Sequence, residues 1–302
     1  MGSMVSLLYE IKDYLYRKMG IVDIDQDLEK VITTYYKMVP AVGSGITKKK
    51  RGREVILSLT TIPDRITKTW ITIESLLRQS CKPDQIILWL AEDEFRGMEL
   101  PDAIKRQMQR GLTVRYCENL RSYKKFYGTM SENPEAFVVT ADDDIIYPEK
   151  MLEVLLKTYQ ENPECVVCNR SHWMRKSHGK LLPYCRWIHW IDRKRGQSEP
   201  LYQNFLTSGG GTLFPVFLLD QRILQKDVFM QLAPLADDVW LNFICWISGV
   251  KVKNTVGALG NVIFIESSAQ KGLLRENVGK SKNDIQIEAV LDYFHIDIDD
   301  YI

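Results

Sequence analysis

Two long stretches of the chain differ in how their apolar residues are spaced. Along residues 4–39 the apolar positions recur every three or four residues, which is typical of amphipathic helices. They are Leu7, Leu8, Ile11, Tyr14 and Leu15, followed by Leu28, Val31, Ile32 and Tyr35. Pro40 interrupts this pattern, and residues 48–53 read Lys-Lys-Lys-Arg-Gly-Arg. The pattern predicts a helical N-terminal extension and a basic linker over residues 1–53.

From residue 54 onward, short apolar runs alternate with segments of helical spacing. The runs at 54–60, 85–90, 112–117 and 136–141 predict buried strands, and the segments at 67–79, 101–110, 122–130 and 148–160 predict helices. This alternation indicates an α/β domain with a central, mostly parallel sheet flanked by helices. We expect it to cover 54–292, as halves 54–150 and 151–292, and to leave 293–302 as a tail. Ligands of such sheets bind beyond the carboxyl ends of the strands.

An acidic triplet follows the fourth predicted strand. Asp142, Asp143 and Asp144 come directly after the apolar run that ends at Ala141. If the strand geometry continues, Asp142 and Asp144 point to the same side. Two such carboxylates suit Mg²⁺ or Mn²⁺, which would take its remaining oxygens from a substrate diphosphate. An acidic turn that caps the helix near Pro148 is the alternative, although a cap needs a single Asp.

The order of these segments resembles that of a known enzyme family. An apolar strand that ends in Asp-x-Asp, fourth in an α/β half, resembles the glycosyltransferases of the GT-A fold. The segments 55–65 (VILSLTTIPDR), 75–79 (SLLRQ) and 83–88 (PDQIIL) are similar to family-2-like transferases of bacterial capsule and lipopolysaccharide synthesis. The resemblance covers residues 54 to about 290 and implies a GT-A-like fold for nucleoside-diphospho-sugars.

The resemblance also implies where the donor nucleotide binds. In the family, the loop after the first strand holds the base and ribose, and this loop contains Thr60, Thr61, Pro63 and Arg65. An acid after the second strand lies near the base, which favours Asp93, although exposed helix-capping acids explain it equally well. Lysines before the metal strand suit a base or a diphosphate as point charges. They are Lys124 and Lys125.

The second half contains the predicted acceptor site. The glycine segment 209–211 needs close backbone approach or positive φ angles, and the resemblance places Gly210 and Gly211 beside the donor sugar, with a plain turn as the alternative. The acidic pair that opens an apolar helix matches the family's catalytic pair, with Asp238 as the base and Asp237 before it. An N-cap is the alternative for this pair. Lys280 and Lys282 match a segment that closes over the diphosphate, or they belong to a surface loop.

Composition excludes several classes of protein. The 302 residues include 40 Lys and Arg against 39 Asp and Glu, so the net charge of +1 gives no sign of nucleic-acid binding. Cys165 and Cys168 lie in an apolar strand-like run, which favours buried thiols over a metal or redox pair. No apolar run is long enough to span a membrane. We expect a cytoplasmic protein, or one that is peripheral at the inner face of the membrane through residues 4–53. The alternative for the basic run in these residues is a solvated linker.

These features together predict an enzyme. The resemblance implies a metal-dependent, inverting glycosyltransferase, and specifically a hexosyltransferase that uses a UDP-sugar, Mn²⁺ or Mg²⁺, and a glycan or lipid-linked acceptor. A nucleotidyltransferase is one alternative, although it usually has a glycine-rich basic signature after the first strand, and the segment 61–65 has no glycine. A non-catalytic carbohydrate-binding protein is the other.

Overall fold

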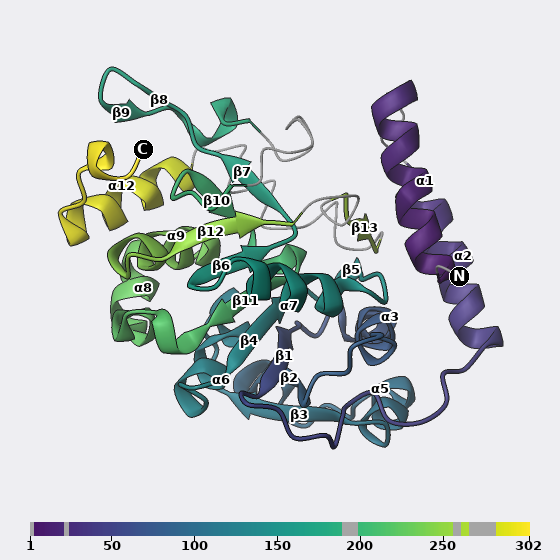
Figure 1. Ribbon diagram of the computed structural model, residues 1–302. Coiled ribbons are helices and arrows are strands. Elements are labelled where there is room, and N and C mark those ends of the chain that lie inside the picture. Colours follow the sequence, from purple (N-terminus) through teal and green to yellow (C-terminus); the bar gives the residue numbers. More distant parts are fainter. Residues whose placement is uncertain (1–2, 21–23, 189–198, 256–260, 266–281) are drawn as a thin grey trace.

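The computed structural model describes residues 3–20, 24–188, 199–255, 261–265 and 282–302 (Figure 1). The N-terminal part forms helices α1 (Met4–Met19) and α2 (Asp25–Met38). The first half of the remaining chain contains β1 (Val55–Thr60), α3 (Ile66–Leu77), β2 (Gln85–Ala91), α4 (Glu92–Phe95), α5 (Asp102–Met108), β3 (Leu112–Cys117), the 3₁₀ helix η1 (Arg121–Lys125), α6 (Tyr127–Glu132), β4 (Phe137–Ala141) and β5 (Ile145–Ile146).

The second half begins with α7 (Met151–Glu161) and β6 (Cys165–Cys168) and ends near the C-terminus with α12. Between them lie β7 (Ser171–Trp173), β8 (Lys176–Ser177), β9 (Lys180–Leu181), β10 (Asn204–Leu206), β11 (Thr212–Pro215), α8 (Lys226–Leu232), α9 (Asp237–Ile247), β12 (Lys251–Asn254) and β13 (Ile263–Phe264). The 3₁₀ helices here are η2 (Tyr184–Arg186), η4 (Ser208–Gly210), η5 (Val216–Leu218), η6 (Gln221–Leu224) and η8 (Ile298–Asp300), and α12 covers Lys282–Phe294.

A single seven-stranded sheet joins the two halves in the order β12-β6-β11-β4-β1-β2-β3. The neighbours β4-β1, β1-β2, β2-β3 and β12-β6 are parallel, whereas β11 runs antiparallel to both β4 and β6. The predicted α/β architecture with a mostly parallel sheet is therefore confirmed. The carboxyl ends of β1, β2, β4 and β6 share one edge with the segment that enters β11.

The two faces of the sheet bury separate cores, because side chains alternate along each strand. Val55, Leu57 and Leu59 of β1 pack with α3, α5 and α7 in one core. The other core contains Val138 and Val166 with residues of α8, α9 and α12. Figure 1 shows these helices on opposite sides of the sheet. Cys165 and Cys168 are buried free thiols, as the sequence predicts.

Three of the predicted elements differ from those observed. Residues 122–130 form the 3₁₀ helix η1 followed by α6, where one helix was expected. The strand that precedes the acidic triplet ends at Ala141, so residues 142–144 form a turn and do not continue the strand alternation. The helix expected from 148 begins at Met151, after Pro148.

The N-terminal helices pack against the sheet domain beside the acidic triplet. Val5, Tyr9 and Ile32 share a buried cluster with Ile146 and Ile263. The hydroxyl of Tyr9 donates to the carbonyl of Ile146 at 2.6 Å and accepts the N–H of Ile263 at 3.2 Å. Among the described residues, no helix has the length and apolar character needed to cross a membrane.

Candidate functional site

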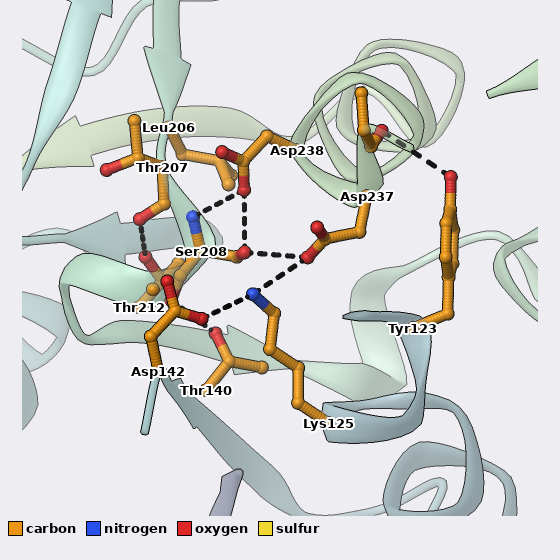
Figure 2. Close-up of polar contacts among 12 residues, drawn as sticks. Tyr123, Lys125, Thr140, Asp142, Leu206, Thr207, Ser208, Thr212, Asp237 and Asp238 are labelled. Atoms are coloured by element: carbon orange, nitrogen blue, oxygen red, sulfur yellow. Dashed lines mark hydrogen bonds and ion pairs between the residues drawn. The ribbon is translucent and has the colours of Figure 1, made fainter. Parts of the chain in front are cut away.

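Several predicted site residues meet at the carboxyl edge of the sheet. Asp142 and Asp144 leave β4, Lys125 ends η1, and Asp237 and Asp238 form the first turn of α9. Lys125 Nζ lies 2.8 Å from Asp142 Oδ1 and 2.9 Å from Asp237 Oδ2. Figure 2 shows this ammonium group between the two carboxylates. One buried lysine therefore connects the predicted metal motif to the predicted catalytic pair.

Ser208 extends this network from Asp237 to Asp238. Its N–H donates to Asp238 Oδ1 at 2.8 Å, and its hydroxyl lies 2.6 Å from the same oxygen and 2.9 Å from Asp237 Oδ2 (Figure 2). The N-cap of α9 is Ala236, which makes no side-chain cap bond, so an N-cap role does not account for the two acids. Their place in the first turn is stabilised by the positive end of the helix dipole.

The electrostatics separate the two neighbouring acids. Burial and the charge of Asp237 raise the pKa of Asp238 to about 6. Burial alone would raise the pKa of Asp237 as well, but Lys125 and Ser208 outweigh it and hold this pKa below its ordinary value. Burial would lower the pKa of Lys125, yet the surrounding carboxylates keep that pKa above its usual range. Asp238 is therefore the acid suited to gain and lose a proton near neutral pH.

Arg65 holds the other end of the acidic triplet. Its guanidinium lies 3.1 Å from Asp143 Oδ1 and 3.0 Å from Asp144 Oδ2. Asp143 is buried, and it also accepts a hydrogen bond from Thr61. Burial raises the pKa of Asp143 to about 7, although Arg65 opposes this effect. Arg65 thus pairs with the acidic triplet and not with Asp64.

Two of the three acids in the triplet have side chains that are accessible to a divalent cation. The side chain of Asp142 is 41% exposed and that of Asp144 is 18% exposed, whereas that of Asp143 is 2% exposed. Across the described ranges, no three His, Cys, Asp or Glu side chains converge to hold a metal by themselves. Mg²⁺ is commonly bound by one or two carboxylates together with substrate phosphates. Asp142 and Asp144 match that arrangement.

The glycine segment lets the backbone approach the acidic triplet. A Cβ atom at Gly209 would lie 1.7 Å from Asp142 Oδ2, and one at Gly210 would lie 2.9 Å from the Cβ of Arg170. Gly211 has a φ of +88°. The hydroxyl of Tyr147 bonds both the N–H of Asp142 and the carbonyl of Gly209. The expected close approach and positive φ are both present.

Other predicted residues lie away from this acidic centre. Thr60 donates to the carbonyl of Trp89, and Pro63 is half-buried in the loop after β1. Asp93 opens α4 as an exposed residue beside Asn119. Lys124 is buried and faces Glu94 at 3.6 Å, next to a cavity of about 290 Å³ that none of the acidic-centre residues lines. Lys282 begins α12, and Lys280 lies outside the described residues.

The structure adds residues that sequence reasoning did not assign. They are Tyr147, Arg170, Ser208 and Gly209. Ser208 directly precedes the glycine segment 209–211, Gly209 is its first residue, and Tyr147 closely follows the acidic triplet. Their contacts depend on which backbone groups meet at the edge of the sheet. A local pattern does not contain that information.

Comparison with known proteins supports the fold. A scan against family models and a search of curated proteins both find no match. Among solved structures, the chain is similar to the mannosyltransferase PcManGT from Pyrobaculum calidifontis, which was solved with GDP-Man and Mn²⁺. The TM-score is 0.50 and the identity 12%, over 96% of this chain and 74% of that chain.

A second solved structure is 4-diphosphocytidyl-2C-methyl-D-erythritol synthase. Its TM-score is 0.41 and its identity 14%, over 69% of this chain and 92% of that one, which is too weak to carry an argument. The chain has a GT-A-like α/β fold. At these identities the likeness extends to the fold alone.

Proposed function

We propose that this chain is a metal-dependent, inverting glycosyltransferase. It would transfer a hexosyl group from a nucleoside-diphosphate sugar to a hydroxyl of a glycan or lipid-linked acceptor. One observation carries the proposal. A continuous set of contacts leads from Asp142 through Lys125, Asp237 and Ser208 to Asp238, on one edge of a GT-A-like sheet. A site that contains both the proposed metal ligands and the proposed base supports transfer from a nucleoside-diphosphate sugar.

The protein residues divide the chemistry between them. Asp238 takes the proton of the acceptor hydroxyl as its oxygen forms a bond to the anomeric carbon. The bond from that carbon to the diphosphate oxygen breaks, and its electron pair leaves with the nucleoside diphosphate. Asp142 and Asp144 would hold a divalent cation, which would neutralise charge on the departing diphosphate. Arg65 and Lys125 hold these two acids in position when no cation is bound.

The donor, the acceptor and the biological setting follow from the sequence resemblance. We propose a UDP-sugar as donor and a role in bacterial capsule or lipopolysaccharide synthesis. The contacts for the base and ribose would come from the loop at 60–65 and from Asp93. Lys124, Gly210, Gly211, Lys280 and Lys282 remain proposed donor contacts. The transferase domain would cover residues 54–292 and be followed by a tail at 293–302, and α12 runs two residues past that boundary to Phe294.

The test is donor hydrolysis, since many transferases slowly cleave their donor without an acceptor. UDP-, GDP-, CMP- and dTDP-sugars are incubated with the protein in Mn²⁺ or in EDTA, and the released nucleotide is measured. We expect release from one donor that depends on Mn²⁺ and is lost in Asp144→Asn. Asp102→Asn is the matched control, because that carboxylate is 83% exposed on α5.

The same assay separates the alternatives. Release of pyrophosphate from a nucleoside triphosphate, with no nucleoside diphosphate from any sugar donor, would indicate a nucleotidyltransferase. Donor binding without release, in the presence of an acceptor mixture, would indicate a carbohydrate-binding protein. Release that is equal in Mn²⁺ and EDTA would contradict metal dependence.

We further propose that α1 contacts an anionic membrane surface. Its side chains Leu7, Ile11 and Tyr14 are 58%, 40% and 60% exposed and are spaced to share one helix face. Exposed lysines of the 48–50 linker add positive charge. Vesicle flotation tests this idea with phosphatidylglycerol and phosphatidylcholine vesicles. Leu7→Glu with Tyr14→Glu should abolish recovery with the anionic vesicles, and unchanged recovery would overturn the proposal.

A further inference from the structure

Arg170 occupies a fixed place at the edge of the candidate site. It follows β6, and its carbonyl accepts the N–H of Thr207 at 3.0 Å and the hydroxyl of Thr207 at 3.3 Å. Thr207 precedes Ser208, which holds Asp238. A Cβ at Gly210 would come within 2.9 Å of the Arg170 Cβ. The backbone and the base of this side chain are therefore held against the glycine segment.

The guanidinium of Arg170 lacks the partners that the other cations of the site have. Arg65 pairs with two carboxylates, and so does Lys125. In the part of the chain that the structure describes, the Nε of Arg170 is buried without a hydrogen-bond partner, and no ion pair includes this arginine. The residue as a whole is half-buried, but an enclosed guanidinium nitrogen without a partner is costly. An anionic ligand would supply what is missing.

The contacts of Arg170 with Thr207 and Gly210 place it beside Ser208, which holds Asp238. Burial lowers its pKa, whereas Tyr184, Asp238, Asp142 and Asp144 act electrostatically in the opposite direction. An arginine remains charged under such conditions. The group is therefore a permanent cation on the segment that packs against Thr207 and Gly210, next to the serine that holds Asp238.

The sheet order indicates which substrate Arg170 faces. In the order β12-β6-β11-β4-β1-β2-β3, strand β6 lies on the opposite side of β4 from β1, β2 and β3. The proposed contacts for the nucleotide follow β1 and β2. An arginine that follows β6 thus lies across β4 from the proposed base and ribose contacts, beside Thr207 and Ser208, and Ser208 holds Asp238.

We propose that Arg170 binds an oxyanion on the acceptor, so that the acceptor is an acidic or phosphorylated sugar. This inference rests on the proposed function, because it assumes an acceptor at Asp238. The planar guanidinium offers paired N–H donors that match a carboxylate or a phosphate. Both anions share this chemistry, and the experiment distinguishes them.

Saturation-transfer NMR titrations measure the binding of three probes. Methyl glucuronide carries a carboxylate, glucose 6-phosphate carries a phosphate, and methyl glucoside is neutral. A bidentate charged contact predicts that at least one anionic probe binds wild-type protein about tenfold or more tightly than the neutral probe. The anion that shows this preference identifies the acceptor group.

Variants assign the preference to one side chain. Arg170→Gln should reduce it below about twofold, and Arg170→Lys should retain part of it, because an ammonium keeps the charge but loses the paired donors. Arg175→Gln is the control, because Arg175 is an exposed arginine on the same part of the chain. This variant should prefer the anionic probe over the neutral probe as strongly as wild-type protein does. Circular dichroism confirms folding, and if Arg170→Gln is unfolded, the Arg170→Lys result decides.

Equal binding of all three probes to wild-type protein overturns the proposal, as does failure of both anions to bind. A preference that persists in Arg170→Gln overturns it as well. Donor hydrolysis by wild-type protein is scored separately. Its absence contradicts the glycosyltransferase proposal, whereas intact hydrolysis without anion preference contradicts only the role of Arg170.

Discussion

Replacing Lys125 with Met would remove the cation between two carboxylates in the acidic centre. The side chain of Asp142 is 41% exposed, so water can solvate it after the change. The side chain of Asp237 is only 10% exposed and would be left as a buried, unpaired charge. Breaking a buried ion pair costs about 3–5 kcal/mol. Because one partner can reach water, we expect Lys125→Met to lower the free energy of unfolding by about 3 kcal/mol.

Chemical denaturation at pH 7 measures this loss, and thermal unfolding should show a decrease on the order of 6–10 °C. Lys124→Met is the matched control. That lysine is equally buried, but it faces Glu94, whose side chain is 31% exposed, at 3.6 Å. Its loss should cost about 1 kcal/mol or less, because a carboxylate near water needs its partner less. The double variant Lys125→Met with Asp237→Asn should recover most of the lost stability.

The pH dependence gives a second check on the same reasoning. Lys125 holds the pKa of Asp237 below its ordinary value in the folded protein. The stability from this pair is therefore present above the unfolded pKa of about 3.9 and is lost as the pH falls through the folded pKa. The gap between wild type and Lys125→Met should narrow below about pH 4. If Lys125→Met and Lys124→Met lowered the free energy of unfolding equally at pH 7, this reasoning would be refuted.

Three further outcomes follow from the acidic centre. Asp238→Asn should lower acceptor-dependent transfer about 100-fold or more while nucleotide binding by calorimetry stays normal, and a near-normal rate would remove Asp238 as the base. Because the pKa of Asp238 is raised to about 6 and a base must be deprotonated, kcat/KM should fall as the pH drops below that value and level off above it; a rate that stays flat down to pH 5 would contradict this. Gly209→Ala should abolish Mn²⁺-dependent donor hydrolysis, since its Cβ would lie 1.7 Å from Asp142 Oδ2. Gly97→Ala is the control, because Gly97 lies in an open turn, and the rate of donor hydrolysis should stay unchanged in this variant. The stability of both variants is measured separately from their rates.

The sequence contained enough information for the sheet and for much of the acidic centre. Short, nearly continuous apolar runs predict β1, β2, β3 and β4, because strands that are buried on both faces of a sheet carry apolar residues at successive positions. The order of the strands is a different matter. Strand β11 lies between β4 and β6, and this insertion depends on contacts between residues far apart in the chain. Local spacing does not encode them.

In the candidate site, too, local patterns predict some residues, whereas the contacts between separate elements do not follow from the sequence. The sequence predicts Asp142, Asp144 and Asp238 as candidates because charged residues stand out beside apolar runs. Ser208 was missed, since a serine next to glycines has no distinctive pattern until its N–H and hydroxyl are seen to reach Asp238. The pairing of Lys125 with both Asp142 and Asp237 could not be read from spacing either, because it joins three separate elements.

The position of Tyr9 affects how this protein should be shortened for experiments. Its hydroxyl joins Ile146, which closely follows the acidic triplet, to Ile263 on the neighbouring strand, and the N–H of Ile265 in turn donates to the carbonyl of Asp144 at 2.8 Å. A recombinant fragment that starts at Glu54 would lose the two hydrogen bonds of Tyr9 and expose apolar side chains of β5 and β13 to solvent. Inactivity of such a fragment would then report damage to the backbone behind Asp144. The proposed membrane contact is better tested apart from the proposed catalysis by changing the outward face of α1 than by removing the helix.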